Sequence, residues 1–267
     1  MGFAMKDAEL ATESLMRDNT RLIQRLEKYR MSQKGQSLTL TEKLTAAWIF
    51  HDHLVEGRTF NPEEIMAALR GDDDQFPSYF SPLFNDIRDY AEALEWIIEW
   101  SEEGPSGLSL ERFESLHRHL LKHEPKEGAA YRKNSPVHRD YHQPIVSHKK
   151  VEAMMHQLFT ETLGNFDPTT DDIITFAASV HHQLMFIYPY RRSPGLVARL
   201  FTNQLLMAHG YPPVMIAGHE RGEYYDALAA HEPRQLVVLF QRSVARYLDM
   251  ASVQDRKVRR KLQRYAS

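Results

Sequence analysis

Two apolar stretches joined by a short polar turn constrain the fold more than any other feature of this chain. Residues 173–187 carry apolar side chains three or four positions apart, the spacing of one helix face. Their helical pattern stops at Pro189, and a second apolar stretch runs from residue 196 to about residue 205, ahead of Gly210. The pattern predicts a core in which two apolar helices are joined by a turn.

Helical spacing also dominates the N-terminal half. It predicts a helix that ends near Gly57 and another that starts at residues 61–64, where an asparagine can cap and a proline suits the first position. A third apolar stripe covers residues 87–98. A fourth helix begins after Ser109, whose hydroxyl can cap the helix start.

One segment breaks the helical pattern. Residues 128–148 are polar and contain Pro136 and Pro144, and apolar side chains do not recur there at helical spacing. We interpret this segment as a loop or a short β-hairpin. The fold class that follows is mainly α, with one small hairpin at most.

Composition limits the class of protein. The chain has 33 Lys and Arg against 36 Asp and Glu, so nothing global points to a nucleic-acid partner. No apolar run is long enough to span a bilayer, and the first ten residues lack the apolar core of a signal peptide. Cysteine is absent, which excludes disulfides and thiolate sites. These features fit a cytoplasmic protein without a membrane partner.

The polar turn between the two apolar helices is a candidate anion site. A tight turn that leads into a helix presents unpaired backbone N–H groups and the positive end of the helix dipole, which favour phosphate. Arg191 and Arg192 lie in the turn, and Arg199 follows one helical turn after Gly195. Three guanidinium groups near one helix start favour a phosphate or an acidic partner. On spacing alone, a solvated turn between two core helices fits the same residues.

This turn resembles the signature of the Fic family. That signature reads His-Pro-Phe-x-(Asp/Glu)-Gly-Asn-Gly-Arg-x-x-Arg and lies between two such helices. Residues 188–199 fall in the same register, from Tyr188 to Arg199, and Gly-Tyr-Pro-Pro at residues 210–213 follows where relatives have a similar run.

Other blocks agree with the family in order and distance. Residues 116–120 resemble the helix that precedes the family's flap, a hairpin that aligns the target peptide, and residues 131–132 resemble its start. Residues 50–57 resemble the N-terminal inhibitory helix of some relatives, whose motif is usually Ser-x-x-x-Glu-Gly. The resemblance spans roughly residues 45–245. It implies a Fic-type helical core with a flap hairpin at residues 131–148 and an inhibitory-type helix before it.

The resemblance also implies a reaction. In the family, the motif His is the general base for a protein hydroxyl, which attacks the α-phosphate of a nucleotide, usually ATP, so that AMP is transferred to the target. Tyr188 occupies the position of that His. Because a free histidine titrates near ~6.5 and a tyrosine near ~10, Tyr188 is a poor base at neutral pH.

Three more parts of the signature differ. The Asp or Glu that binds Mg²⁺ in the family is Arg192, which would repel the metal. The Gly-Asn-Gly segment reads Ser-Pro-Gly at residues 193–195, and its proline removes one backbone N–H from the anion cradle. The next arginine is Leu196, so only Arg199 survives among the polar groups. We therefore expect that ordinary AMP transfer is lost and that no Mg²⁺ is bound.

Glu56 and Arg199 form a predicted ion pair. In relatives with the inhibitory helix, its Glu pairs with the second arginine of the signature and blocks the γ-phosphate of the nucleotide. Both residues persist here, although Asp52 replaces the motif's Ser and Arg58 replaces its usual Asn. On sequence alone, an exposed glutamate at a frayed helix end also fits.

The chain has 14 histidines, some of them in pairs such as His117 with His119 and His181 with His182. None has the spacing of a zinc site, and no structural metal is expected. His181 lies seven residues before Tyr188 on the same predicted helix face. It is therefore a candidate replacement base, although it would be about two turns away.

The sequence predicts three parts: an N-terminal helical segment with the inhibitory-type helix at residues 1–100, a Fic-like core at 101–250 and a basic tail at 251–267. The leading hypothesis is a degenerate Fic protein that no longer transfers AMP. It would bind ATP or another nucleotide-type anion, or a target protein along the flap at 131–148. The alternative is a transferase with altered, metal-independent chemistry from a nucleotide-type donor to a protein hydroxyl. No oligomeric state is predicted.

Seven residues make up the candidate site. They are Tyr188 at the catalytic position, Arg191, Arg192, Ser193, Gly195 and Arg199 for nucleotide or anion binding, and Glu56 as the inhibitory residue.

Overall fold

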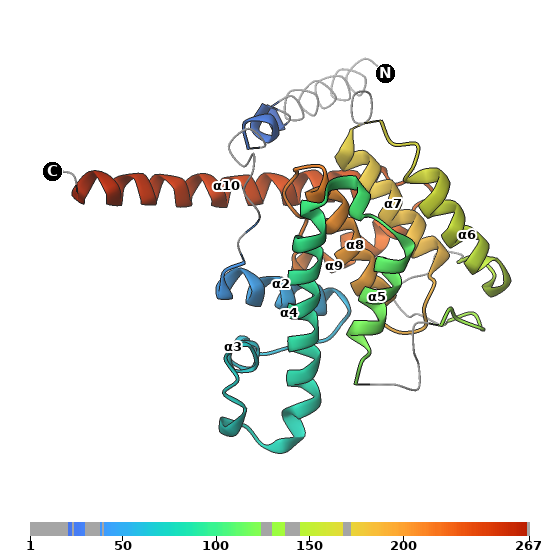
Figure 1. Ribbon diagram of the computed structural model, residues 1–267, viewed down its shortest axis with the longest axis horizontal. Helices are drawn as coiled ribbons and strands as arrows, with labels where there is room; N and C mark the ends of the chain where they lie inside the picture. Colours follow the sequence, from blue (N-terminus) through green and yellow to red (C-terminus); the bar gives the residue numbers. More distant parts are fainter. Residues whose placement is uncertain are drawn as a thin grey trace, which may run out of the picture.

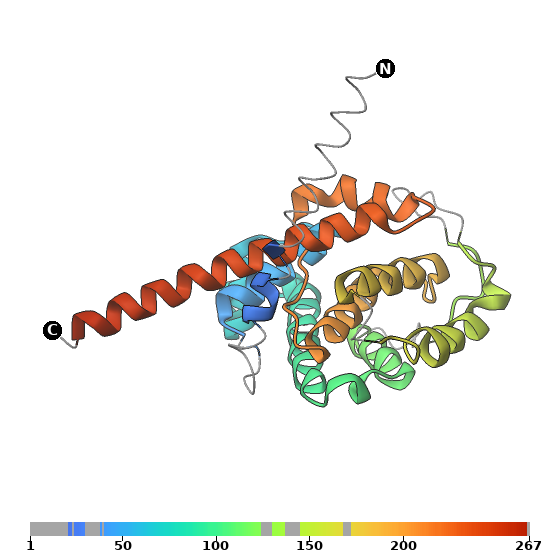
Figure 2. The ribbon, with the colours of Figure 1, turned by 90° about the horizontal axis from the view of Figure 1, so that it is seen from above.

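The computed structural model describes residues 21–22, 24–29, 38, 40–123, 130–136, 145–167 and 172–265, with the backbone alone for residues 252–265. The described residues form helices and connecting turns, and no strand occurs among them. Figures 1 and 2 show the helices gathered into one body, from which the C-terminal part of the last helix projects.

Helix α8 (Pro194–Ala208) lies at the centre of this body. All of its residues from Pro194 to Leu206 are buried, which requires other elements on every side. It packs against α4 (Ser81–Glu102), α5 (Leu110–Leu120) and α7 (Ile173–Ile187), which surround it in Figure 1. The two apolar stretches of the sequence are therefore α7 and α8, packed on each other as predicted.

Further helices in the described part of the chain cover this core. They include α2 (Glu42–Val55), α3 (Pro62–Arg70), α6 (Val151–Gln157), α9 (Arg221–Ala229) and α10 (Arg234–Tyr265), with short 3₁₀ or π turns at 73–75, 78–80, 104–107, 148–150, 158–162 and 218–220. Helices α2 and α3 pack on α4, while α9 and α10 pack on α7. Helix α10 then runs away from the body (Figure 2). No helix in the described part of the chain is both long and apolar enough to cross a membrane.

Local capping residues set several helix boundaries, as the sequence predicts. The Asn61 side chain accepts from the backbone N–H of Glu63 at 3.0 Å, and the Glu64 carboxylate accepts from the N–H of Asn61 at 2.9 Å. Ser109 caps α5 by accepting a backbone hydrogen bond at its first turn. Gly57 follows α2 with a φ of 77°, a left-handed conformation that glycine adopts without steric cost.

The expected flap hairpin lies partly outside the described residues, since residues 137–144 are not among them. Residues 130–136 and 145–147 on either side form no strand. The structure therefore does not support a hairpin in the described parts of this segment. The helical pattern is absent there, as predicted.

Arg132 connects the two sides of this segment to the end of α7. Its guanidinium donates to the carbonyl of Tyr188 at 2.7 Å, to that of Ile187 at 3.2 Å and to that of Val146. It also donates to the carbonyl of Asn134 at 3.1 Å. The last carbonyls of a helix lack partners within the helix, so Arg132 caps α7 while it holds the surrounding chain.

Candidate functional site

The turn between α7 and α8 contains two residues in an unusual backbone conformation. Tyr188 ends α7 with φ 49° and ψ 64°, and Ser193 precedes α8 with φ 52° and ψ 28°. A left-handed conformation costs a non-glycine residue about 1–2 kcal/mol. Neighbouring hydrogen bonds hold the turn in place: Arg132 donates to the carbonyl of Tyr188, and Nε2 of His117 donates to that of Arg192 at 2.9 Å.

Tyr188, which the sequence resemblance aligns with the family's catalytic histidine, is a buried side chain. It is 5% exposed. Burial, followed by the nearby Glu56 carboxylate, raises the pKa of Tyr188 above its ordinary value. A hydroxyl that stays protonated at neutral pH donates a hydrogen bond but does not serve as a base.

Arg199 is buried between two carboxylates from α2. Its Nη2 donates to Oε1 of Glu56 at 2.8 Å, so the predicted ion pair is present. Its Nε donates to Oδ1 of Asp52 at 3.0 Å, and Nη2 also donates to the backbone carbonyl of Asp52 at 3.2 Å. The sequence did not predict this second carboxylate partner. Its signal was the spacing, because Asp52 lies four positions before Glu56 and so on the same helix face.

Two tyrosines complete the surroundings of Arg199, and sequence reasoning missed both. The Tyr90 hydroxyl, from α4, donates to Oδ2 of Asp52. The Tyr224 hydroxyl, from α9, accepts from Nη1 of Arg199 at 3.4 Å, and the guanidinium lies 5.8 Å from the centre of the Tyr224 ring. Both come from other helices, and no local motif links them to Arg199.

His181 belongs to this buried network and does not face the turn. Its Nδ1 lies 3.1 Å from Oγ1 of Thr202, and its Nε2 lies 2.9 Å from the Tyr224 hydroxyl. Burial lowers the pKa of His181 to about 3. With both ring nitrogens bonded inside the core, His181 is not placed to act as a replacement base, and that suggestion is corrected.

Gly195 allows the Glu56 carboxylate to approach the start of α8. A Cβ at this position would lie 2.2 Å from Oε1 of Glu56 and 3.0 Å from Nη1 of Arg199. The ion pair between Glu56 and Arg199 therefore lies against the backbone of α8 at Gly195, where there is no side chain. The glycine that survives from the family signature is needed here for space.

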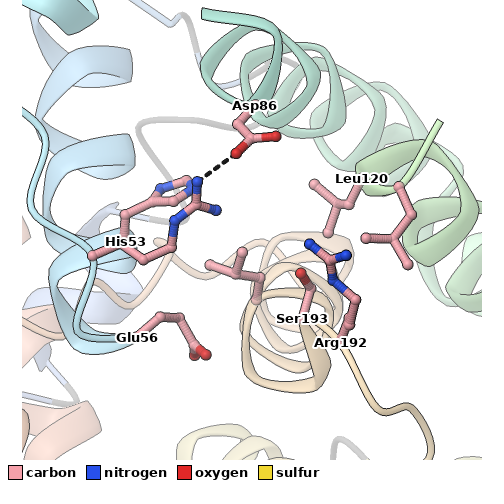
Figure 3. Close-up of a pocket in the computed structure, with 9 residues that line it drawn as sticks. His53, Glu56, Asp86, Leu120, Arg192 and Ser193 are labelled. Carbon is pink, nitrogen blue, oxygen red and sulfur yellow. Dashed lines mark hydrogen bonds and ion pairs between the residues drawn. The ribbon is translucent and has the colours of Figure 1, made fainter. Parts of the chain in front are cut away.

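A pocket of about 300 Å³ opens beside the start of α8 (Figure 3). Its cations are Arg192, from the turn, and Arg58, which forms an ion pair with Asp86. Figure 3 shows Glu56 across the pocket from Arg192, and the apolar residues of the lining are leucines. The lining consists of His53, Glu56, Arg58, Asp86, Leu120, Leu121, Arg192, Ser193 and Leu196.

The structure brings together only part of the predicted site. Glu56, Arg192 and Ser193 line the pocket. Arg199 lies beneath Glu56 and is bound to carboxylates, while Arg191 is exposed and outside the pocket lining. The three guanidinium groups therefore do not converge on one ligand position in this conformation.

The residues of this pocket do not fit Mg²⁺. That ion requires oxygen ligands, usually carboxylates that are free to coordinate it. The two carboxylates of the lining are already paired, Glu56 with Arg199 and Asp86 with Arg58, and a third lining residue, Arg192, adds positive charge that would repel the ion.

One other group has metal-ligand character within the described residues. Asp89, Glu92 and His119 place ligand atoms close together. However, the Lys122 ammonium lies 3.0 Å from Asp89 and 2.7 Å from Glu92, so a cation of the protein already occupies the position between these carboxylates.

Comparison with known sequences supports the family resemblance. The sequence model of the Fic/DOC family matches residues 107–206. The protein adenylyltransferase Fic of Nematostella vectensis is 28% identical over 181 residues, which are 67% of this chain and 42% of that protein. The protein of the same name from Drosophila melanogaster is 36% identical over 114 residues, 42% of this chain and 23% of that protein. The chain thus spans less than half the length of these relatives.

Comparison with solved structures shows the fold. Fic-1 from C. elegans matches with a TM-score of 0.76 and 19% identity, over 94% of this chain and 76% of that one. A Fic domain containing signaling protein from Bacteroides thetaiotaomicron matches with a TM-score of 0.64 and 17% identity, over 88% and 91%. The predicted helical core of this type is confirmed.

Proposed function

Since the chain is a Fic family protein, we propose that it uses the family's site at the start of α8 to bind a nucleotide-type anion and does not carry out ordinary AMP transfer. The observation that carries this proposal is that Arg192, which the sequence resemblance aligns with the family's metal-binding acid, lines the pocket. A fixed cation there attracts an anion directly and leaves no place for Mg²⁺.

The chemistry of the surrounding groups supports binding without ordinary transfer. AMP transfer requires a base for the attacking hydroxyl and a cation that neutralises the phosphates. Tyr188 is buried and stays protonated at neutral pH, and no carboxylate of the pocket is available for a metal. Tyr188 therefore does not supply the base, and the described lining of the pocket offers no free carboxylate for the metal of ordinary AMP transfer.

The pocket also has features that suit a nucleotide. Its volume of about 300 Å³ lies at the lower end of the range for small-molecule sites. Leu120, Leu121 and Leu196 in the lining offer apolar surface for a base ring, while Arg192 and the start of α8 offer positive charge for a phosphate.

We assign Glu56 an inhibitory role in this binding. Its carboxylate lines the pocket and is hydrogen-bonded to Arg199, so it occupies the position that a ligand phosphate would need. Ligand binding and the ion pair would then compete. Replacement of Glu56 should strengthen ligand binding.

Calorimetric titration tests the proposal. The protein is titrated with ATP, AMP and a nucleotide sugar, with and without Mg²⁺. We expect binding that does not depend on Mg²⁺, that increases in Glu56→Gly, and that weakens about tenfold in Arg192→Ala, a loss of about 1.4 kcal/mol. Arg191→Ala is the matched control, because it removes the same charge from the neighbouring, exposed position. No binding to either the unmodified protein or Glu56→Gly would refute the proposal.

A transferase with altered chemistry is the second candidate. Arg192 favours it, since a guanidinium can neutralise an anionic donor without a metal. The acceptor would be a hydroxyl of a target protein along residues 131–148. Incubation of a labelled donor with candidate proteins in the presence of a chelator distinguishes the two: labelled product means metal-independent transfer, and its absence with intact binding favours a binding protein.

A further inference from the structure

We propose that Asp52 determines which anions the site accepts: it neutralises Arg199 independently of Glu56 and thereby disfavours a triphosphate relative to a monophosphate. This inference rests on the proposed nucleotide-binding function. It assigns a specificity-determining role to a residue that lies outside the pocket lining.

The two carboxylates on Arg199 differ in how firmly they are held. The Asp52 side chain is 2% exposed, and both of its oxygens are bonded, one to Nε of Arg199 and the other to the Tyr90 hydroxyl. The Glu56 side chain is 17% exposed and lines the pocket, and its bond is to Nη2 of Arg199. Glu56 can therefore turn into the pocket, whereas Asp52 stays where it is.

The charges of Arg199 and Asp52 limit which ligand group can take the place of the Glu56 carboxylate. One guanidinium lies between two carboxylates, so Arg199 and Asp52 without Glu56 form a neutral pair. A ligand phosphate that takes the place of Glu56 would meet a cation already balanced by a buried carboxylate. Like charges at short range in a poorly hydrated site repel strongly.

The described lining of the pocket holds two cationic side chains that could balance a triphosphate, Arg192 and Arg58, and Arg58 is paired with Asp86. The carboxylates of this lining are paired with arginines and are not free to bring in Mg²⁺. One phosphate can be accommodated by Arg192 and the start of α8, but the extra charge of a triphosphate cannot be balanced in the same way.

The hydrogen bonds of Arg199 indicate the same preference. Nε and one N–H of Nη2 donate to Asp52, at 3.0 Å to its side chain and 3.2 Å to its backbone carbonyl. These bonds fix the plane of the guanidinium. The donor released by Glu56 is a single N–H of Nη2, so the ligand gains one bond rather than the two-pronged contact that arginine makes with a fully bound phosphate.

Titration of two variants with AMP and ATP, both without Mg²⁺, tests the inference. In Glu56→Ala we expect AMP to bind about tenfold more tightly than ATP, because Asp52 remains. Adding Asp52→Asn should raise the affinity for ATP about tenfold and change that for AMP by about threefold or less. The control is Asp89→Asn, which removes an equally buried carboxylate outside the pocket and should leave the preference unchanged. Equal affinities for the two nucleotides in Glu56→Ala would overturn the inference.

A second measurement needs no ligand and separates this inference from the proposed function. The Nε–H resonance of Arg199, identified by its loss in Arg199→Lys, reports the bond to Asp52. We expect it to remain protected from solvent exchange in Glu56→Ala and to exchange rapidly in Asp52→Asn. Loss of protection of the Arg199 Nε–H in Glu56→Ala would overturn the role of Asp52, regardless of which nucleotides the protein binds. If the Arg199 Nε–H is protected as expected but no variant binds AMP or ATP, the proposed nucleotide-binding function is refuted. The preference for a monophosphate is then refuted as well.

Discussion

The Glu56 carboxylate reaches Arg199 across the first turn of α8, at the position of Gly195. Almost no free space remains there, since a Cβ on Gly195 would lie 2.2 Å from Oε1 of Glu56. The charged pair is consequently sensitive to a single methyl group. Gly195, which has no side chain to form a hydrogen bond, thus controls the geometry of the hydrogen bond between Glu56 and Arg199.

We predict that Gly195→Ala displaces Glu56 and lowers the free energy of unfolding by about 1–3 kcal/mol, the usual cost of inserting atoms into a packed region. Denaturation in urea measures the change. Gly222→Ala is the control, because a Cβ there meets nothing within 4 Å, and it should be neutral or slightly stabilising. Combining Gly195→Ala with Glu56→Ala should recover part of the loss; unchanged stability in the single variant would contradict the argument.

Among the elements, the end of α7 depends on a residue far away in the sequence. Arg132 supplies donors to the carbonyls of Ile187 and Tyr188, and it binds the chain on both sides of the segment that follows α5. A cation at the C-terminus of a helix also interacts favourably with the helix dipole. The left-handed conformation of Tyr188 is held in part by this contact.

We predict that Arg132→Lys destabilises the protein by about 1–3 kcal/mol, because a lysine keeps the charge but cannot bridge several carbonyls at once. The expected signature is a lower melting temperature together with faster amide exchange at Val146, whose N–H donates to the carbonyl of Phe186. Arg118→Lys, at an exposed position of α5, provides the comparison. If the two variants melt alike, Arg132 is not a cap of α7.

Across the whole molecule, close packing around α8 buries histidines in uncharged form. His181 is 0% exposed and His53 is 1% exposed, and burial lowers the pKa of each to about 3. The unfolded chain takes up a proton on such a residue near pH ~6.5, whereas the folded protein does so only near pH 3. Stability is therefore complete above pH ~6.5 and is lost as the pH falls towards 3.

We predict that the free energy of unfolding falls by about 2 kcal/mol between pH 7.5 and 5 for His181 alone, since each pH unit below ~6.5 costs about 1.4 kcal/mol. Urea denaturation at the two pH values measures it. In His181→Gln, the difference in the free energy of unfolding between the two pH values should shrink by that ~2 kcal/mol. In His156→Gln, which changes an exposed position, it should not shrink. The same pH dependence in both variants would exclude His181 as the cause.

The helices and their ends were predictable from the sequence because their signals are local. The caps at Asn61 and Ser109, the left-handed Gly57 and the stop before Pro189 act within a few residues of where they stand. The register of the family signature also predicted that Glu56 and Arg199 would meet. The hairpin expected for residues 131–148 rested on that resemblance and on the loss of helical spacing there, and the described parts form no strand.

Only the tertiary structure decided what surrounds Arg199 and the pocket. Tyr90 and Tyr224 reach Asp52 and Arg199 from α4 and α9, and Arg191 is left outside the pocket that Arg192 lines. These outcomes depend on how whole helices pack against α8. A helical period fixes which face of a helix is apolar, but the partner of a polar side chain is fixed by the three-dimensional arrangement of separate helices.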